Sequence, residues 1–166
     1  MESSNKDFRV AVLTVSDRTY SGEREDESGP AIRRIMEKAG YFVEAVTVVP
    51  DEADRIENAL LEFSDRDGVD LVLTTGGTGF AARDITPEVT LKIAHRNAPG
   101  ISEAIRAFSL TKTKHAVLSR GVSVIRNSTL IINLPGSPRA CEESLQVIMD
   151  ALPHGLGILK GLKLDK

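Results

Sequence analysis

The stretch from Val69 to Glu88 reads VDLVLTTGGTGFAARDITPE, which predicts a strand, a glycine loop and a helix start in that order. The first five residues are almost all apolar, and the Thr-Pro-Glu at the end is typical of a helix start. Glycine lets the backbone approach an anion closely, and successive backbone N–H groups can hold one. Because open α/β sheets bind ligands at the carboxyl ends of their strands, we expect a binding site at this loop.

Further apolar runs on both sides of this stretch predict more strands. The run at residues 8–15 is nearly continuous, which is the pattern of a strand buried on both faces, and residues 41–49 and 129–134 form two others. Shorter strand-like pieces occupy residues 116–118 and 122–125. Polar loops follow residues 15, 49, 73 and 134, and parallel strands would gather these four loops at one edge of the sheet.

Amphipathic helical patterns separate the predicted strands. We expect helices that begin near Ser28, after Asp51, near Thr86, near Ile101 and near Cys141. Ser28 suits the cap of the first helix, and Gly40 suits its end. We expect Pro99-Gly100 to break the third helix, which begins near Thr86. The last helix carries apolar residues as far as Leu152. This alternation predicts right-handed βαβ units, and therefore an α/β fold: a three-layer sandwich with a mainly parallel sheet and helices on both faces.

The composition is that of one globular domain. The 166 residues fit a single domain over 1–166, in which we expect residues 1–6 to be flexible, and 41% hydrophobic with 27% charged residues is ordinary for such a domain. A net charge of -3 argues against nucleic acid or a lipid surface as partner. No apolar run approaches the roughly 20 residues that span a membrane, and the polar start lacks a signal-peptide core, which favours the cytoplasm.

Three aspartates lie at predicted strand ends and are candidate site residues. Asp84 follows the glycine loop, and because Thr86 suits the helix cap, Asp84 is left to face a ligand. Asp51 either caps the helix that follows it or belongs to the site, and Asp17 either pairs with Arg18 or belongs to the site. Two carboxylates from neighbouring strand ends suit Mg²⁺, which proteins commonly hold through one or two carboxylates, water and substrate phosphates.

Other site chemistries find less support in the residues. Residues 77–82 match the G-x-G-x-x-A pattern of dinucleotide-binding loops, but they follow a mid-chain strand and stand three residues before the helix start, so a nicotinamide-dependent oxidoreductase is the weakest alternative. No lysine follows the glycines as in a Walker A loop, and neither a nucleophile elbow nor a histidine cluster indicates covalent catalysis. The one cysteine, Cys141, excludes an internal disulfide and a cysteine zinc site, and we expect it to be a packed thiol.

Six motifs are spread along almost the whole chain. They are TVSD at 14–17, VPDE at 49–52, TTGGTG at 74–79, RDITPE at 83–88, LSR at 118–120 and NLPGSP at 133–138. Together they resemble the molybdenum cofactor biosynthesis family, which includes the bacterial MogA and MoaB proteins and the G domain of gephyrin. The resemblance implies a trimeric, MogA-like molybdopterin-binding fold. It also implies a molybdopterin adenylyltransferase that converts molybdopterin and MgATP into adenylyl-molybdopterin and pyrophosphate.

The resemblance further implies roles for residues of this chain. Asp51 and Asp84 match the two functional aspartates of the family and would hold Mg²⁺ directly or through water. The positions that match the pterin and nucleotide pocket are Ser16, Asp17, Thr75, Gly76, Gly77, Thr78, Gly79, Ser109, Ser119, Asn133, Pro135, Gly136 and Ser137. Apart from the resemblance, we expect the amides of residues 76–79 to hold a substrate phosphate, with a basic side chain such as Arg83 or Arg120 assisting, and the sequence leaves open which basic residues contact ATP. The implied partners are two further copies of the chain and a molybdenum-insertion protein, and the open alternative is a molybdopterin-binding scaffold without catalysis.

Overall fold

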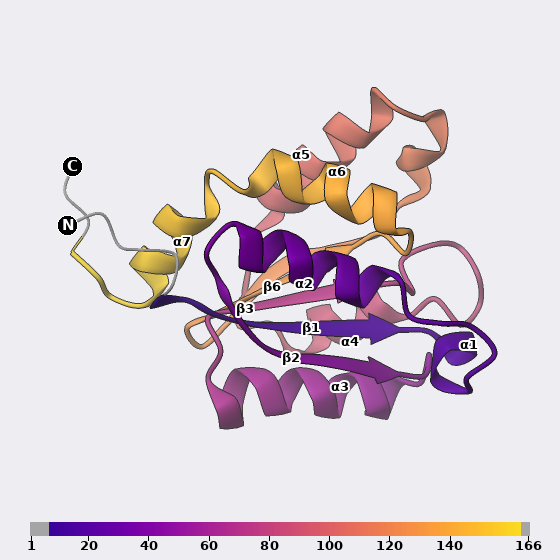
Figure 1. Ribbon diagram of the computed structural model, residues 1–166, viewed down its shortest axis with the longest axis horizontal. Helices are drawn as coiled ribbons and strands as arrows, with labels where there is room; N and C mark the ends of the chain where they lie inside the picture. The colour runs from indigo at the N-terminus through magenta and orange to yellow at the C-terminus, as the bar shows by residue number, and fades with distance from the viewer. Residues whose placement is uncertain (1–6, 164–166) are drawn as a thin grey trace.

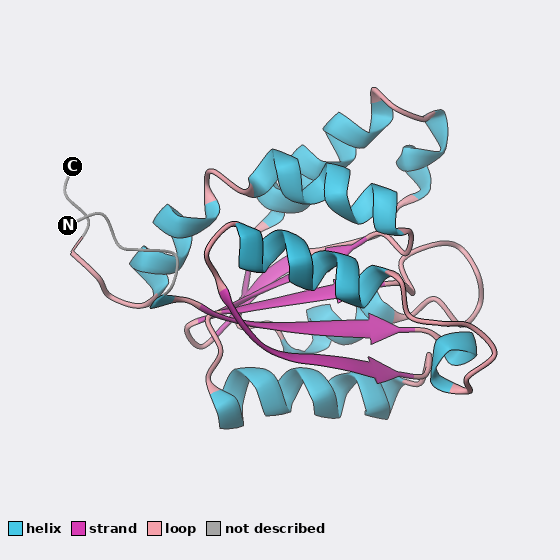
Figure 2. Cartoon of the chain, viewed as in Figure 1, coloured by secondary structure: helices cyan, strands magenta, loops and turns pink. Residues whose placement is uncertain are grey.

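A computed structural model describes residues 7–163, in which one six-stranded sheet lies between two layers of helices (Figure 1 and Figure 2). Residues 1–6, for which we expected flexibility, lie outside the described residues. The strands are β1 (Arg9–Val15), β2 (Phe42–Val49), β3 (Leu71–Thr75), β4 (Arg96–Asn97), β5 (Ser123–Arg126) and β6 (Thr129–Leu134). Their order in the sheet is β2-β1-β3-β6-β5-β4.

Four neighbouring strands of this sheet are parallel and end at the same edge. β1 pairs in parallel with β2 and β3, and β3 pairs in parallel with β6, whereas β5 runs antiparallel to β6 and β4 antiparallel to β5. The register places Val15 beside Val49, and Thr75 beside Leu134. The predicted mainly parallel sheet is therefore confirmed, and the four loops that follow these strands start side by side.

The helices cover both faces of the sheet, as predicted. They are α1 (Asp17–Tyr20), α2 (Ser28–Lys38), α3 (Ala53–Leu61), the π-helix η2 (Glu62–Asp67), α4 (Thr86–Ile93), α5 (Pro99–Leu110), the 3-10 helix η3 (Lys114–Leu118), α6 (Pro138–Ile148) and α7 (Leu152–Leu159). In Figure 1, α2 and α6 lie above the sheet and α3 below it. Buried side chains of α2, α6 and α7 pack on one face, and those of α3 and α4 on the other. No described helix has the length and apolar character that a membrane span requires.

Three expectations about local structure are wrong. Residues 116–118 belong to the 3-10 helix η3, because Thr113 caps a turn there by accepting a hydrogen bond from the N–H of His115, and the side chains of Val117 and Leu118 are exposed. Pro99 does not break a helix but begins α5, since proline suits the first helical turn, and the short exposed strand β4 precedes it. The last predicted helix is two helices, because Pro153 begins α7 after α6 has ended at Ile148.

The glycine loop after β3 lies against the end of β1. Gly76 has a φ of +93°, a conformation that other residues rarely adopt, and a Cβ built on it would lie 2.3 Å from the carbonyl oxygen of Val15. No side chain therefore fits between the two backbones at this point. The residue type at 76 sets how closely the loop approaches the end of β1.

Replacing Gly76 by alanine should destabilise the protein by roughly 3 kcal/mol, because the change adds a steric clash to a strained φ. Gly22 is the matched control, since its φ is +83° and a Cβ there would meet nothing within 4 Å. Gly22→Ala should therefore cost only the conformational strain, roughly 1 kcal/mol. Urea unfolding of both variants measures the two free energies, and equal losses would show that the contact with Val15 is of no importance.

Candidate active site

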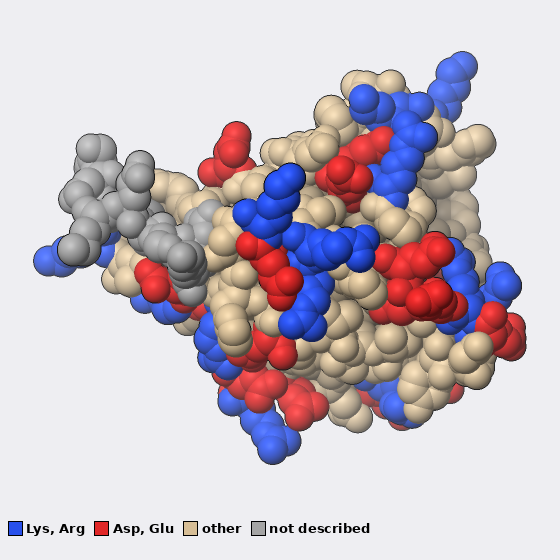
Figure 3. All heavy atoms as spheres, in the orientation of Figure 1, with Lys and Arg blue, Asp and Glu red and all other residues tan. Residues whose placement is uncertain are grey.

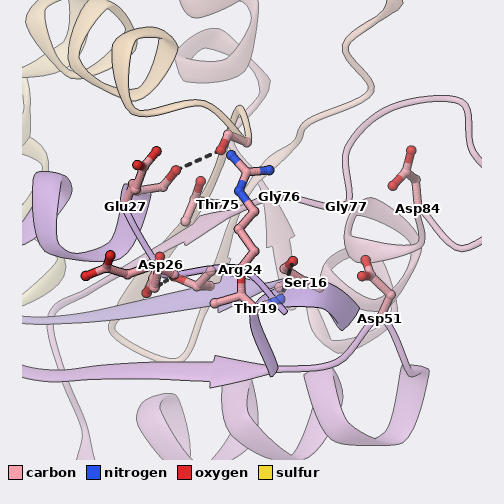
Figure 4. A pocket seen from close by; sticks show the side chains of 15 residues that line it. Ser16, Thr19, Arg24, Asp26, Glu27, Asp51, Thr75, Gly76, Gly77 and Asp84 are labelled. Atoms are coloured by element: carbon pink, nitrogen blue, oxygen red, sulfur yellow. Dashed lines mark hydrogen bonds between the residues drawn. The ribbon is translucent and has the colours of Figure 1, made fainter. Parts of the chain in front are cut away.

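A polar pocket of about 230 Å³ lies at the edge of the sheet where the parallel strands end (Figure 4). The proposed site residues that line it are Ser16, Asp51, Thr75, Gly76, Gly77, Asp84 and Gly136. Thr75 is the last residue of β3, and the others come from the loops after β1, β2, β3 and β6, which are far apart in the sequence. The loop between α1 and α2 forms the opposite wall.

Thr86 holds the carbonyl groups of Gly76 and Gly77, the first two residues of the glycine loop that follows β3. Its hydroxyl donates to the carbonyl oxygen of Gly76 at 3.1 Å, and its backbone N–H donates to that of Gly77, also at 3.1 Å. The expectation that Thr86 caps α4 is therefore wrong, because Ile85 occupies the cap position and no side chain bonds there. A Cβ on Gly77 would lie 2.3 Å from the Thr86 hydroxyl, so only glycine allows this contact.

Arg120 holds the next two carbonyl groups from the opposite side. Its backbone N–H donates to the carbonyl oxygen of Thr78 at 2.9 Å, and its Nε donates to that of Gly79 at 2.8 Å. The same guanidinium pairs with the Glu88 carboxylate, which lowers the pKa of Glu88. The N–H groups of residues 77–79 donate to no group among the described residues. The loop thus turns its carbonyls into the protein and leaves its amides for a ligand.

Asp51 is joined to Asp17 by two reciprocal hydrogen bonds. The N–H of Asp17 donates to Oδ2 of Asp51 at 2.9 Å, and the N–H of Asp51 donates to Oδ1 of Asp17 at 3.0 Å. The alternative that Asp51 caps the following helix is therefore wrong: the cap position of α3 is Glu52, and no side chain bonds there. The Asp51 carboxylate instead binds the first residue of α1, next to the pocket.

Asp17 pairs with Arg83 and not with Arg18. The Arg83 guanidinium donates to both carboxylate oxygens of Asp17, at 2.6 and 2.9 Å, and these hydrogen bonds lower the pKa of Asp17. Arg18 pairs with Glu23 instead. Asp17 is absent from the pocket wall, so the structure places it behind Asp51, where both of its carboxylate oxygens already have partners in the protein.

Asp84 is held at the other end of the glycine loop by local contacts. Its Oδ2 accepts the N–H of Ala81 at 2.9 Å, and its own N–H donates to the carbonyl oxygen of Ala81 at the same distance. Arg120 donates to the carbonyl oxygen of Asp84 at 2.5 Å. The other carboxylate oxygen, Oδ1, accepts no hydrogen bond from the described residues, and neither does Oδ1 of Asp51. Each aspartate thus keeps one oxygen for a ligand.

A second pocket of about 300 Å³ lies on the other side of the glycine loop. It collects a different part of the proposed set, namely Thr78, Gly79, Ser109, Ser119 and Pro135. The rest of its wall includes Arg106 and His115. The proposed residues therefore divide between two neighbouring pockets that share the glycine loop as a partition. A substrate with two distinct parts could reach both.

Asn133 and Ser137, like Asp17, line neither pocket. Asn133 is buried, its amide group donates to the hydroxyls of Thr74 and Thr90, and its Oδ1 accepts the N–H of Val122, so it fixes the floor of the site. Ser137 caps α6 by accepting the N–H of Ala140 at 3.2 Å.

The turn at 135–138 is fixed from below. The hydroxyl of Thr75 and the thiol of Cys141 both donate to the carbonyl oxygen of Pro135, at 2.6 and 3.0 Å. Cys141 is buried, as expected for a packed thiol, and burial raises its pKa to about 11. Ser28 also reaches this turn, because its hydroxyl donates to the carbonyl oxygen of Gly136 at 2.7 Å; the expectation that Ser28 caps α2 is wrong.

The loop between α1 and α2 was missed from the sequence, although its run of charge was visible. Four consecutive charged residues, Arg24 to Glu27, line the pocket. In Figure 4, Asp26 and Glu27 lie on the side away from Asp51 and Asp84. Figure 3 shows acidic side chains gathered at the end of α2 nearest to α1, where this loop lies. Asp26 helps to begin α2, since its Oδ1 accepts the N–H of Gly29 at 3.0 Å.

The charges around Asp51 oppose its ionisation. Burial is the largest cause that raises the pKa of Asp51, and the negative charges of Asp17 and Asp84 add to it, while the N–H of Asp17 and the charge of Arg83 act in the other direction. A carboxylate whose pKa is raised by folding costs stability once it is ionised. At neutral pH the protein therefore keeps this charge in the pocket at the expense of folding stability.

Asp51→Asn should stabilise the ligand-free protein at pH 7, because the amide keeps an acceptor for the N–H of Asp17 and carries no charge. The gain should be roughly 0.5 kcal/mol, since water still reaches this half-buried group. It should be absent at a pH below the ordinary aspartate value of 3.8 and appear as the pH rises through the raised pKa. Thermal unfolding from pH 3 to 8 measures it, and a variant less stable than wild type at pH 7 would refute this account of Asp51.

Comparisons with known proteins identify the family of the chain. A family model described as “Probable molybdopterin binding domain” matches residues 11–154. The chain is similar to the molybdopterin adenylyltransferase of Escherichia coli (strain K12), with 43% identity over 155 residues that cover 90% of this chain and 80% of that protein. It is also similar to the molybdopterin adenylyltransferase of Haemophilus influenzae, with 40% identity over 172 residues that cover 95% of this chain and 87% of that protein.

A solved structure with the same fold is that of the molybdopterin biosynthesis enzyme MoaB from Thermus thermophilus. Its TM-score is 0.89 and its identity 46%, and the match covers 95% of this chain and 99% of that chain.

Proposed function

Because the chain belongs to the family of molybdopterin-binding domains, we propose that it is a molybdopterin adenylyltransferase of molybdenum cofactor biosynthesis. It transfers AMP from ATP to the terminal phosphate of molybdopterin, and the products are adenylyl-molybdopterin and pyrophosphate. Relatives that carry this enzyme name are similar along 90% or more of the chain. This similarity favours the enzyme over a molybdopterin-binding scaffold without catalysis.

The observation that carries the proposal is the arrangement around the glycine loop. Three consecutive amides, at residues 77–79, are free of hydrogen bonds with the described residues, and Asp51 and Asp84 each keep an unbonded carboxylate oxygen at the same pocket. Backbone amides of this kind bind phosphate oxygens, and carboxylate oxygens bind hard cations. A phosphate site and a carboxylate pair on one loop are what the transfer of a nucleotide group requires.

The charge of the pocket supports Mg²⁺ as part of the site. Carboxylates from Asp51, Asp84 and the loop at 25–27 surround a space that must receive the anionic phosphates of ATP, and Arg24 is the cationic side chain among the lining residues. No three His, Cys, Asp or Glu side chains gather into a metal cluster within residues 7–163, so a cation here would depend on Asp51, Asp84, water and the nucleotide. When bound, Mg²⁺ would offset the charge of the phosphates.

The transfer step needs positioning more than acid–base chemistry. An oxygen of the molybdopterin phosphate, which is already ionised, attacks the α-phosphorus of ATP. The bond from that phosphorus to the bridging oxygen breaks, and pyrophosphate leaves with the electron pair. The amides of residues 77–79 hold a phosphate beside the loop, and the two pockets on either side of it take the nucleotide and the pterin. Alignment of the two substrates then supplies most of the rate.

Pyrophosphate release tests this function directly. Wild-type protein with ATP and Mg²⁺ should release pyrophosphate only when molybdopterin is added. Asp84→Asn should lower kcat by roughly 100-fold, because it removes charge that acts in the transition state, and should leave molybdopterin affinity nearly unchanged. If the molybdopterin affinity and the kcat of Asp84→Asn fall by the same factor, Asp84 only lines the pocket and has no separate role in the transfer. Molybdopterin bound by the wild type with no pyrophosphate released would establish the scaffold instead.

We also propose a homotrimer that meets a molybdenum-insertion protein, as the resemblance implies, and a cytoplasmic location, as the sequence analysis predicts. An apolar groove of about 440 Å³ between α5, α6 and α7 supports association between copies. Its lining includes Ile101, Ala104 and Val147, and exposed apolar surfaces of this kind often mark interfaces.

Sedimentation equilibrium measures the oligomer. The expected mass is about three times the 18.0 kDa of one chain. Ala104→Glu places a charge in the groove and should shift the mass toward one chain if copies associate there. A wild-type mass of 18.0 kDa over a wide range of protein concentration would overturn the trimer.

A further inference from the structure

We propose that Arg83 is a positioning residue for Asp51 and acts on it through Asp17. The inference deepens the function proposed above and rests on it, because it concerns one of the two carboxylates that the transfer reaction uses. The sequence suggested instead that Arg83 assists at a substrate phosphate. Its contacts in the structure are with the protein.

The three residues form one chain of contacts across three strand-end loops. Arg83 lies in the loop after β3 and binds both carboxylate oxygens of Asp17, which follows β1, at 2.6 and 2.9 Å. Oδ1 of Asp17 also accepts the N–H of Asp51, which follows β2, and the N–H of Asp17 donates back to Oδ2 of Asp51. A guanidinium that binds two carboxylate oxygens fixes the plane of that carboxylate. The plane of the Asp17 carboxylate sets where its Oδ1 meets the N–H of Asp51, and so where the backbone that carries the Asp51 carboxylate lies.

A contribution to folding stability does not account for the ion pair between Arg83 and Asp17. The side chains of Arg83 and Asp17 are 59% and 40% exposed, and exposed ion pairs contribute little to folding. Without the guanidinium, the charge of Asp17 would stand uncompensated behind Asp51, next to the pocket that Asp51 and Asp84 line. Arg83 offsets that charge while it holds Asp17 in one orientation, so the Oδ1 of Asp51 stays directed at the pocket.

The competing role for Arg83 is direct contact with an ATP phosphate. The two roles make opposite predictions for Asp17. If Arg83 binds ATP, Asp17→Asn frees the guanidinium and should leave the KM for ATP unchanged or lower it. If Arg83 positions Asp51, Asp17→Asn and Arg83→Ala break the same chain of contacts and should have the same effect.

Steady-state kinetics of four variants separate these roles. Arg83→Ala and Asp17→Asn should each lower kcat between about tenfold and 100-fold, with the KM for ATP within about twofold of wild type. The double variant should be no slower than the slower single variant, because both changes remove one unit. Arg83→Lys keeps the charge but not the paired geometry, so it should recover only part of kcat. A raised KM for ATP in Arg83→Ala alone would overturn the proposal and assign Arg83 to ATP.

Amide hydrogen exchange tests the same contacts without any substrate. The N–H groups of Asp17 and Asp51 are protected by their reciprocal hydrogen bonds, and both should exchange about tenfold faster in Arg83→Ala. Unchanged exchange at both amides would overturn the proposal. If the wild type releases no pyrophosphate, the adenylyltransferase assignment fails, and this measurement still decides the role of Arg83.

Arg126→Ala is the matched control. Arg126 also binds both oxygens of an aspartate on another element, Asp65, at 2.8 and 2.7 Å, but it lies on β5, away from the pocket. The Arg126→Ala substitution should lower the melting temperature at least as much as Arg83→Ala does. It should leave kcat and the hydrogen-exchange rate of the Asp51 amide unchanged. A loss of kcat in Arg126→Ala similar to that in Arg83→Ala would mean that both variants act through general stability, and would overturn a specific role for Arg83.

Discussion

The contact between the backbones of Gly76 and Val15 is the constraint on which the site depends. The loop after β3 passes so near the end of β1 that a Cβ on Gly76 would lie 2.3 Å from the carbonyl oxygen of Val15. This approach brings the glycine loop, Asp51 and the start of α1 to one small pocket. Gly77 repeats the requirement one residue later, because its Cβ would meet the hydroxyl of Thr86. Glycine is therefore required at both positions because it has no side chain. A side chain at either position would push apart the loops that form the pocket.

The hydrogen bonds of the glycine loop occupy its carbonyl groups and leave its amide groups available to an anion. Thr86 and Arg120 take up the carbonyl groups of residues 76–79, so the dipoles of those peptides point their positive ends outward. Arg120 has a second effect, because it also holds the backbone of Asp84. The two arginines that the sequence suggested as aids at a substrate phosphate instead contact the surroundings of one candidate carboxylate each, Arg120 at Asp84 and Arg83 behind Asp51.

The long strands and the place of the site could be read from the sequence because they follow local rules. Runs buried on both faces are apolar throughout, and parallel strands must end together, so the loops after residues 15, 49, 73 and 134 were predicted to meet. The structure of residues 116–118 was predicted wrongly, because an apolar run of three residues does not distinguish a strand from a helical turn. The cap at Thr113 favours the turn. Partners distant in sequence were also hidden. Arg83 and Asp17 are 66 residues apart, and Arg18 was the nearer choice. The division into two pockets depends on how α5 and η3 pack, which no local pattern encodes.

The buried thiol of Cys141 has a practical consequence for studying this protein. It is the one cysteine of the chain, it lies under the turn at 135–138, and its pKa of about 11 keeps it in the unreactive protonated form near neutral pH. A maleimide or a thiol-reactive spin label would therefore not react with Cys141 in the folded protein. A cysteine introduced at position 80 in the glycine loop, where Phe80 is 71% exposed, would be the single reactive thiol of the native chain. The molecule is in this respect already a cysteine-light background, in which a fluorophore could report on movements of the loop at each turnover.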